Sequence, residues 1–343
     1  MNHLLTKLRA LADPTRLRIV LLIRQLELSV GEIVQILGQS QPRVSRHIRI
    51  LDEAGITERR KEGSWVFLRP GRALSDGELD SLFASIDGYD IASGDIAMLE
   101  KVRAERAAMA DRYFAQHAAE WDRLRSMHVA ESEVEDAMRR VLDTAPLGRV
   151  LDIGTGTGRM IELFGADASH FTALDNNSEM LRIARAKLAG LVPDDLEQGR
   201  VEIILGDFNA LPLADESFDT ILFHQVLHYA QNPEFVIAEA ARVLRPGGRM
   251  VIVDFAAHDR EELRNVHAHA RLGFSDEGIS RAFTKAGIRM AHQLTLEGGE
   301  LAVNIWLGRD QRENSAPSKE GKLSSSTAPN LKPNLRPNLR NVA

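Results

Sequence analysis

A glycine-rich loop with acidic residues around it is the part of the sequence best suited to chemistry. Gly154, Gly156 and Gly158 follow the apolar run RVLDI, which predicts a buried strand, and precede the helical pattern RMIEL. Asp175 lies 21 residues after Gly154, where a second strand should end and present a carboxylate to the hydroxyls of a ribose. The fingerprint for dinucleotides requires Gly or Ala where this chain has Arg159, so NAD fits the loop less well.

Three further motifs follow the glycine loop. They are GDF at 206–208, DESFDTILFHQVLHY at 215–229 and LRPGG at 244–248, within a part of the chain where predicted strands alternate with helices. Together with VLDIGTGTG at 150–158, they resemble the ordered motifs of class I methyltransferases that use S-adenosylmethionine (SAM). The resemblance covers about residues 110–309. It implies an α/β fold of the Rossmann-like type with a mostly parallel seven-stranded sheet.

The same resemblance assigns roles to individual residues. It implies that Asp152 lies near the methionine amino group, that Asp175 accepts both ribose hydroxyls and that Asp207 receives the adenine amino group. SAM has no phosphate, so carboxylates take the place of phosphate clamps. Alternatively, Asp175 and Asp207 are acidic residues of ordinary turns that follow strands. The full set predicted to bind SAM, or its demethylated product S-adenosylhomocysteine, is Asp152, Gly154, Gly156, Gly158, Asp175, Asn176, Asp207, Phe208 and His224.

Polar and aromatic residues after the fourth predicted strand are candidates for a methyl-transfer pocket, because open α/β sheets hold ligands at the carboxyl ends of their strands. These catalytic candidates are His224, His228 and Tyr229. Alternatively, His224 lies behind the methionine part of SAM, and His228 and Tyr229 pack at the start of a helix. Tyr113 and Trp121 resemble the N-terminal lid of many small-molecule methyltransferases, with core packing as the alternative.

Metal chemistry has little support in the sequence. The chain has no cysteine, which excludes disulfides, thiolate metal sites and cysteine nucleophiles. The segment HAHAR places His267 and His269 on one predicted helix, where residues two apart point to different sides. We therefore predict no metal site.

The first 75 residues carry a second set of patterns. Asp13 and Pro14 suit the cap and first position of a helix, and Ser29 with Glu32 forms a capping-box pattern. The segment SQPRVSRHIRIL at 40–51 places apolar residues on one face of a helix and mostly basic residues around the other. After it, ITERRKEGSWVFLRP predicts two short strands. Helices followed by a basic hairpin predict a winged helix-turn-helix domain.

LADPTRLRIV at 11–20, the helix at 40–51 and the hairpin resemble the ArsR/SmtB family of bacterial repressors. The resemblance implies a homodimer on double-stranded operator DNA, with the helix in the major groove and the hairpin at flanking phosphates. A solvated charged helix in a protein-interaction module is the alternative. The family's best-known metal box has cysteines where this chain has ELSVGEI at 27–33, so soft-metal sensing and thiol-dependent arsenite methylation are disfavoured. The predicted DNA contacts are Gln41, Arg43, Ser45, Arg46, His47, Arg59, Arg60 and Lys61.

Charge is divided unevenly along the chain. Residues 1–72 hold 13 Lys and Arg against 7 Asp and Glu, whereas residues 73–309 hold 24 against 39. The excess of basic residues in 1–72 predicts that this part of the chain binds a polyanion. The alternative is that the charges are unevenly distributed by chance. No stretch reaches the roughly 18 uncharged apolar residues that would span a bilayer, and there is no signal-peptide pattern. We expect a cytoplasmic protein without a membrane partner.

These patterns predict four parts. They are a winged helix-turn-helix domain at 1–75, a helical linker and lid at 76–145, a SAM-binding methyltransferase domain at 146–309 and a disordered tail at 310–343. We predict a transcriptional regulator in which binding of SAM or S-adenosylhomocysteine is coupled to DNA repression. The alternative is an active methyltransferase of a small molecule, with a DNA-binding head that controls its own gene or a neighbour.

Overall fold

The computed structural model describes most of the first 312 residues. The described ranges are 2–62, 65–74, 76–84, 93–121, 131–189, 199–297 and 300–312. They belong to one compact unit that ends at Arg312, and nearly all of the predicted tail at 310–343 lies outside the described residues. No helix in the described ranges is long and apolar enough to cross a membrane.

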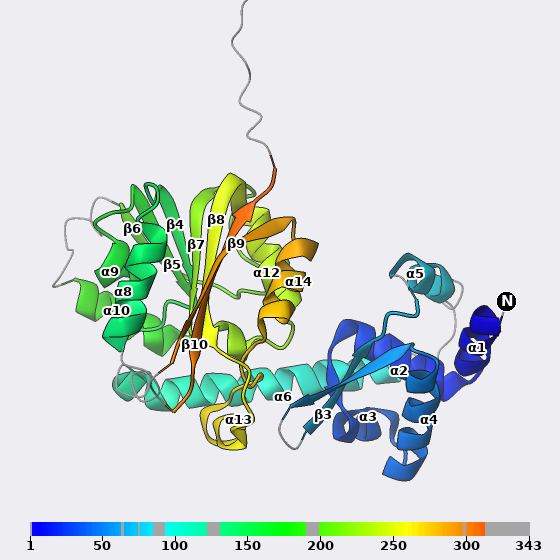
Figure 1. Ribbon diagram of the computed structural model, residues 1–343. Helices are drawn as coiled ribbons and strands as arrows, with labels where there is room; N and C mark the ends of the chain where they lie inside the picture. The colour runs from blue at the N-terminus through cyan, green and yellow to red at the C-terminus, as the bar shows by residue number, and fades with distance from the viewer. Residues whose placement is uncertain are drawn as a thin grey trace, which may run out of the picture. The chain divides into compact units, whose positions relative to one another are not determined.

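The N-terminal domain combines helices with a small antiparallel sheet (Figure 1). Its elements are α1 (Asn2–Leu11), α2 (Pro14–Gln25), β1 (Leu28–Ser29), α3 (Val30–Leu37), α4 (Gln41–Glu53), β2 (Thr57–Glu62) and β3 (Trp65–Pro70). The Asp13 carboxylate accepts a hydrogen bond from the Arg16 N–H at 3.1 Å and caps α2. Both halves of the capping box between Ser29 and Glu32 are present at α3. The sheet has the order β1-β3-β2, and the predicted winged helix-turn-helix is confirmed.

Two more helices, α5 (Asp76–Ala84) and α6 (Ser93–His117), follow the hairpin. The first half of α6 belongs to the core of the N-terminal domain, where Leu99 is fully buried. Arg18 on α2 holds Asp95 on α6 through two hydrogen bonds of 2.5 and 2.6 Å. Further along the same helix, the Asp111 carboxylate accepts a hydrogen bond of 2.8 Å from the Asn177 side chain, in the second domain. One continuous helix therefore takes part in both domains.

A seven-stranded sheet lies at the centre of the second domain. Its strands are β4 (Arg149–Ile153), β5 (His170–Asp175), β6 (Val201–Leu205), β7 (Phe218–His224), β8 (Leu244–Phe255), β9 (Ile288–Leu296) and β10 (Val303–Asp310). They lie in the order β6-β5-β4-β7-β8-β10-β9, and the pairs among β4 to β8 are parallel while β10 is antiparallel to both neighbours. The predicted α/β fold with a mostly parallel seven-stranded sheet is confirmed. The direction of winding changes between β4 and β7, which is where such sheets bind ligands.

Helices cover both faces of this sheet (Figure 1). The elements are η1 (Ala118–Glu120), α8 (Glu131–Leu142), α9 (Arg159–Phe164), α10 (Ser178–Leu188), η2 (Leu227–Tyr229), α12 (Pro233–Val243), α13 (Glu261–His267) and α14 (Asp276–Lys285). Side chains of α8, α9 and α10 share one core, and those of α12 and α14 share the other. Successive strand residues point to opposite faces, so Val150 joins the first core and Leu151 the second. Because both faces are filled, ligand sites fall at the strand ends.

Candidate cofactor-binding site and DNA-binding face

The glycine loop joins the end of β4 to α9 in a conformation that most side chains would oppose. Gly154, Gly156 and Gly158 have φ angles of 74°, 55° and 88°, in the left-handed region that favours glycine. A Cβ atom on Gly154 would lie 2.2 Å from Val226 Cγ2, and the Gly154 N–H donates to the Leu174 carbonyl on β5 at 2.8 Å. Glycine is thus needed both for the turn and for close approach.

Asp175 ends β5, and its carboxylate braces the glycine loop. It accepts hydrogen bonds from the N–H groups of Gly156 and Asn177, each at 2.9 Å. Burial raises the pKa of Asp175, and these backbone N–H groups partly oppose the shift. A carboxylate oxygen accepts more than one hydrogen bond, so both oxygens keep acceptor capacity for ribose hydroxyls. That role of Asp175 stays a prediction.

Two other predicted residues lie near the carboxyl ends of the central strands. Asp152 is fully buried on β4, and His224, which is 6% exposed, ends the neighbouring parallel strand β7. Both line the same cavity as Asp175. The parallel arrangement thus brings together residues that are far apart in the sequence, at the edge where open α/β sheets bind ligands.

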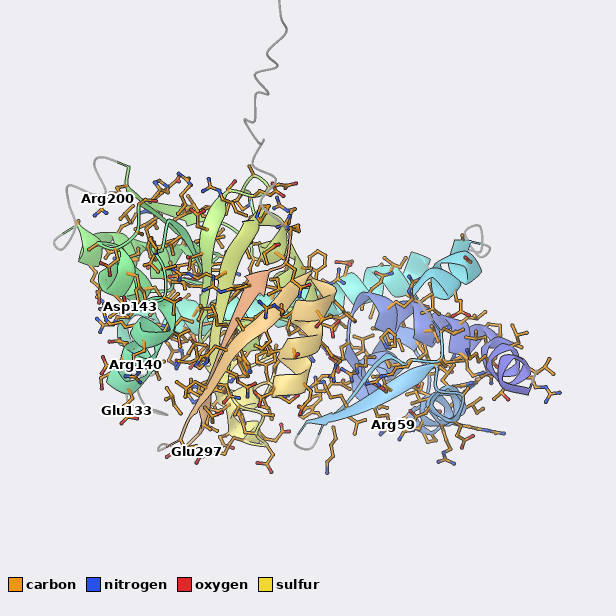
Figure 2. All side chains as sticks on the ribbon, turned by 45° about the horizontal axis from the view of Figure 1, so that its top comes forward. Arg59, Glu133, Arg140, Asp143, Arg200 and Glu297 are labelled. Atoms are coloured by element: carbon orange, nitrogen blue, oxygen red, sulfur yellow. The ribbon has the colours of Figure 1, made fainter. Side chains whose placement is uncertain are left out.

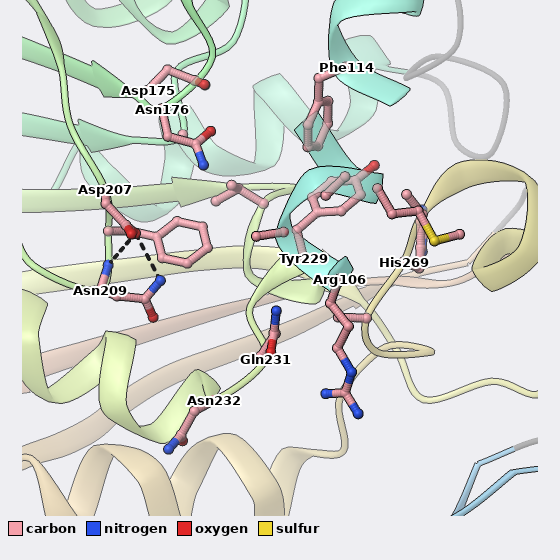
Figure 3. A pocket seen from close by; sticks show the side chains of 18 of the residues that line it. Arg106, Phe114, Asp175, Asn176, Asp207, Asn209, Tyr229, Gln231, Asn232 and His269 are labelled. Carbon is pink, nitrogen blue, oxygen red and sulfur yellow. Dashed lines mark hydrogen bonds between the residues drawn. The ribbon is translucent and has the colours of Figure 1, made fainter. Parts of the chain in front are cut away.

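Asp207 and Phe208 follow β6 and line the same cavity, as does Asn176. One oxygen of the exposed Asp207 carboxylate accepts hydrogen bonds from the N–H and the side-chain amide of Asn209, each at 2.8 Å (Figure 3). These bonds fix the turn and leave the second oxygen available as an acceptor. An acceptor next to an aromatic residue suits the amino group and ring of adenine.

The cavity lined by these residues has a volume of about 920 Å³. The carboxylates of Asp152, Asp175 and Asp207 and the glycine loop fit SAM, which brings an ammonium group, ribose hydroxyls and a sulfonium rather than phosphates. Arg159, where the dinucleotide fingerprint would have its last small residue, is held by Glu135 and Glu162 at 2.6 and 2.5 Å. Its guanidinium is therefore engaged in ion pairs and is not a free clamp for a pyrophosphate.

Aromatic side chains form another part of the cavity wall. The Phe114 ring on α6 lies 4.6 Å from the Tyr229 ring and 5.3 Å from the Trp121 ring, between centroids. Figure 3 shows Phe114, Tyr229 and His269 to the right of Asp175, Asn176, Asp207 and Asn209. Of the two predicted lid residues, Trp121 lines the cavity. The buried Tyr113 packs instead, with its hydroxyl 2.6 Å from His267 Nδ1.

His228 and Tyr229 differ although they are neighbours in η2. Tyr229 lines the cavity, whereas His228 is 2% exposed and its Nδ1 is hydrogen-bonded to the buried Asp254 at 2.7 Å. The packing alternative therefore describes His228 best. The sequence reasoning missed Asp254, although a single acid at the end of the apolar run MVIVDF was a usable signal.

The prediction that one helix carries both His267 and His269 is wrong. Helix α13 ends at His267, and Ala268 takes a left-handed φ of 57°, with its N–H bonded to the Leu263 carbonyl. His269 therefore lies beyond the helix, where it is 5% exposed and lines the cavity. Among the residues that the structure describes, no group of three or more His, Cys, Asp or Glu side chains could hold a metal ion.

Helix α4 presents part of the predicted DNA-binding set to solvent. Gln41, Arg43 and Arg46 are exposed and Ser45 is half-buried, while the apolar face of the helix is in the core. His47 is directed toward the cap of α2, with its Nδ1 3.6 Å from an Asp13 oxygen. The structure therefore leaves Gln41, Arg43 and Arg46 accessible on α4, whereas His47 is directed toward Asp13.

The three consecutive basic residues of β2 do not share a face. Arg59 and Lys61 are exposed, and Figure 2 shows Arg59 at the surface of the N-terminal domain. Arg60 bonds to Glu27 at 2.6 Å, and its guanidinium lies 5.0 Å from the centroid of the Phe67 ring. The alternation follows from the period of two in a strand. The DNA contacts of this strand stay a prediction, for which Arg59 and Lys61 are better placed than Arg60.

Comparisons with known protein families match two separate parts of the chain. Residues 13–58 match the family "Bacterial regulatory protein, arsR family", and residues 151–252 match the family "Methyltransferase domain". The predicted fusion of an ArsR-type regulator with a methyltransferase domain is thereby confirmed. An ArsR-type domain implies binding to DNA, and a methyltransferase domain implies binding of SAM or S-adenosylhomocysteine.

Curated relatives match the second domain. Phosphatidylethanolamine N-methyltransferase of Cereibacter sphaeroides is 34% identical over 45% of this chain and 76% of its own length. Demethylmenaquinone methyltransferase of Clavibacter sepedonicus is 37% identical over 35% of this chain and 49% of its own length. The chain thus spans about half the length of some relatives. The YcgJ protein from Bacillus subtilis is a structural match at 18% identity, covering 53% of this chain and 100% of that protein with a TM-score of 0.45. The chain belongs to the methyltransferase family, with an ArsR-type domain in front.

Proposed function

We propose that the protein is a DNA-binding regulator in which occupancy of the methyltransferase domain by SAM or S-adenosylhomocysteine changes the affinity for operator DNA. It would act in the cytoplasm as a homodimer that presents two α4 helices to adjacent half-sites. The ligands would be held by the nine residues predicted from the sequence, with Asp152, Asp175 and Asp207 at the polar groups. The two ligands differ by one methyl group and the sulfonium charge, which a site lined by carboxylates distinguishes electrostatically.

The observation that carries this proposal is the continuous helix α6. Near its start, Asp95 is bonded to Arg18 of the helix-turn-helix domain. Near its end, Asp111 holds the side chain of Asn177, and the N–H of Asn177 bonds to Asp175 in the cofactor site. In this proposal a change of ligand at Asp175 is passed to the DNA-binding domain along α6, and the contacts at the two ends of this helix support such a route.

Calorimetry tests the coupling directly. SAM and S-adenosylhomocysteine are titrated into the full chain, alone and bound to an operator selected from a pool of random duplex DNA. Because coupling between two ligands is reciprocal, at least one of them should bind with a different affinity when DNA is present. Equal affinities with and without DNA for both ligands would contradict regulation, even where both bind tightly.

A second candidate function is methyl transfer to a small molecule, and the aromatic wall of the cavity favours it. Phe114 and Tyr229 line the cavity in addition to the residues predicted to hold SAM. A purely sensory site needs no space for an acceptor, whereas a transferase must hold acceptor and methyl donor in contact. Incubation of a cell extract with SAM labelled in its methyl group tests this function, since an active enzyme would produce a labelled small molecule.

A further inference from the structure

We propose that His269 takes the proton from the methyl acceptor, and that this acceptor is a planar ring bearing a hydroxyl group. The inference rests on the second candidate function, methyl transfer from bound SAM. His269 lines the cavity just beyond the end of α13 and is 5% exposed. Its position is set by Ala268, whose left-handed φ of 57° is unusual for a residue with a side chain.

A buried carboxylate lies behind His269. Asp254 on β8 is fully buried and accepts hydrogen bonds from His228 Nδ1 at 2.7 Å, from the His228 N–H at 3.1 Å and from the Phe255 N–H at 2.8 Å. In the described part of the chain, the side chain paired with Asp254 is the imidazole of His228, and no Lys or Arg pairs with it. These three bonds fix the position of the carboxylate and hold the His228 ring in one orientation.

The His228 ring passes the effect of this charge to His269 by contact. The two imidazole rings lie 4.1 Å apart between centroids, with an interplanar angle of 31°. A negative charge behind the stack favours a positive charge on the imidazole in front of it, where the dielectric is low. His228 and Asp254 are positioning residues in this arrangement, because neither lines the cavity. His269 does, and is the group able to meet an acceptor.

Rings next to His269 define the shape of the acceptor. The Tyr229 ring is edge-on to the His269 ring at 5.2 Å, and Phe114 is edge-on to Tyr229 at 4.6 Å. Aromatic faces and edges at such spacings favour a flat ring between or beside them. Burial raises the pKa of Tyr229 well above its ordinary value, so its hydroxyl stays protonated and is a hydrogen-bond donor for an acceptor oxygen.

The chemical step needs no further reactant. The acceptor oxygen attacks the methyl carbon of SAM, a C–O bond forms, and the bond from this carbon to sulfur breaks with its electron pair left on sulfur. The sulfonium becomes the neutral thioether of S-adenosylhomocysteine. The hydroxyl proton moves to the His269 imidazole and is later lost to water. General bases of this kind contribute about 10² to 10⁴-fold to the rate.

The rate should depend on pH through His269, which must be neutral to accept the proton. Removal of the Asp254 charge makes protonation of His269 harder, so the acidic limb of the profile of kcat against pH should move to lower pH in Asp254→Asn. A purely structural role for Asp254 would leave that limb in place. Among the described residues, the ionisable groups near His269 or its supports include His228 and Tyr229 of η2, Asp254 of β8, Arg264 and His267 of α13, Tyr113 of α6, and Arg271, whose N–H donates to the His228 carbonyl.

The experiment uses the full-length protein with methyl-labelled SAM and three acceptor probes, which are catechol, 2-naphthol and aniline. His269→Asn is compared with His292→Asn, a matched change at an exposed histidine on β9. We expect the wild type to methylate catechol and 2-naphthol. In His269→Asn, kcat should fall about 10² to 10⁴-fold while KM for SAM is unchanged. His292→Asn should have the wild-type rate. Thermal unfolding and SAM calorimetry on each variant confirm that it is folded.

Three outcomes would overturn the inference. They are equal rates in His269→Asn and His292→Asn, transfer to aniline alone, and wild-type protein that binds SAM in the calorimeter yet methylates neither hydroxyl probe. In each case SAM binding survives as a separate result. Wild-type protein that gives no heat with either SAM or S-adenosylhomocysteine would contradict the proposed function itself, so the two failures are distinguishable.

Discussion

The cofactor site and the DNA-binding face are built in opposite ways. Asp152 and Asp175 are buried and come from separate strands, and Asp175 also holds the glycine loop by hydrogen bonds. Arg43 and Arg46 are exposed and lie within one turn of α4. A buried residue that serves both fold and ligand changes both when it is replaced. An exposed residue on a helix changes binding and leaves stability nearly untouched.

Replacement of Asp175 by Ala should give the largest effect on the cofactor side. Two hydrogen bonds from ribose to a charged acceptor are worth about 1.5 to 3 kcal/mol each, so SAM affinity should fall by more than about 100-fold. Asp167→Ala, at an exposed acid after α9, is the matched control and should bind SAM like the wild type. Calorimetry measures both. Equal SAM affinity in the two variants would contradict the placement of the ribose at the end of β5.

Gly154→Ala sharpens the comparison by separating turn strain from close contact. Both Gly154 and Gly247 have a φ of 74°, but a Cβ would meet Val226 at 2.2 Å in the first and nothing within 4 Å in the second. In Gly154→Ala and in Gly247→Ala, the left-handed backbone should lower the free energy of unfolding by about 1 to 2 kcal/mol. The clash with Val226 should lower it by about 1 to 3 kcal/mol more in Gly154→Ala. Denaturant unfolding of the two variants measures the difference. Similar free energies of unfolding would show that the loop relaxes around the new side chain.

Sequence reasoning found the cofactor side of the cavity better than its aromatic side, for a physical reason. Asp152, Gly154 and Gly156 lie in one strand-loop-helix unit, and their spacing alone predicts that they work together. Asp254 and His269 lie on β8 and beyond α13, and tertiary folding alone brings them to His228 and Tyr229. Helix α13 ends before His269 because Ala268 adopts a left-handed φ. The sequence does not predict this end, since alanine normally favours a helix.

In the head, the sequence predicted the elements correctly but grouped the basic residues too broadly. Local capping patterns at Asp13 and Ser29 were sufficient to place the starts of α2 and α3. The run Arg59, Arg60 and Lys61 looked like one basic patch, although the period of two in a strand already requires its middle residue to face the other way. Consideration of that period would have separated Arg60 in advance.

Arg43→Ala and Arg60→Ala turn this alternation into a measurement. Loss of the exposed Arg43 should weaken DNA binding about tenfold, and should lower the slope of log affinity against log salt by about 0.9 if it meets one phosphate. Arg60 is paired with Glu27 at 2.6 Å, so Arg60→Ala should lower stability and leave the salt slope unchanged. Titrations of operator DNA at several salt concentrations, with thermal unfolding in parallel, test both. A reduced slope in Arg60→Ala alone would reverse the assignment of faces.

The smallest expected effect is a pH dependence at the contact between α6 and α13. Burial lowers the pKa of His267, while burial raises the pKa of Tyr113 to about 12, so the Tyr113 hydroxyl stays a donor to a neutral His267 Nδ1. Because the unfolded imidazole has a pKa of about 6.5, this contribution to stability is complete above that pH. It is lost as the pH falls from about 6.5 through the lower pKa of the folded state.

Thermal unfolding from about pH 7.5 to about pH 5 should therefore show a steeper fall of Tm in the wild type than in His267→Gln, which keeps a hydrogen-bonding group that does not titrate. His292→Gln, at an exposed histidine, should follow the wild-type curve. Parallel curves for the wild type and His267→Gln would mean that this contact does not take up a proton. Because the contact joins α6 to the segment that carries His269, a measured pH dependence would also link the packing of α6 to the aromatic side of the cavity.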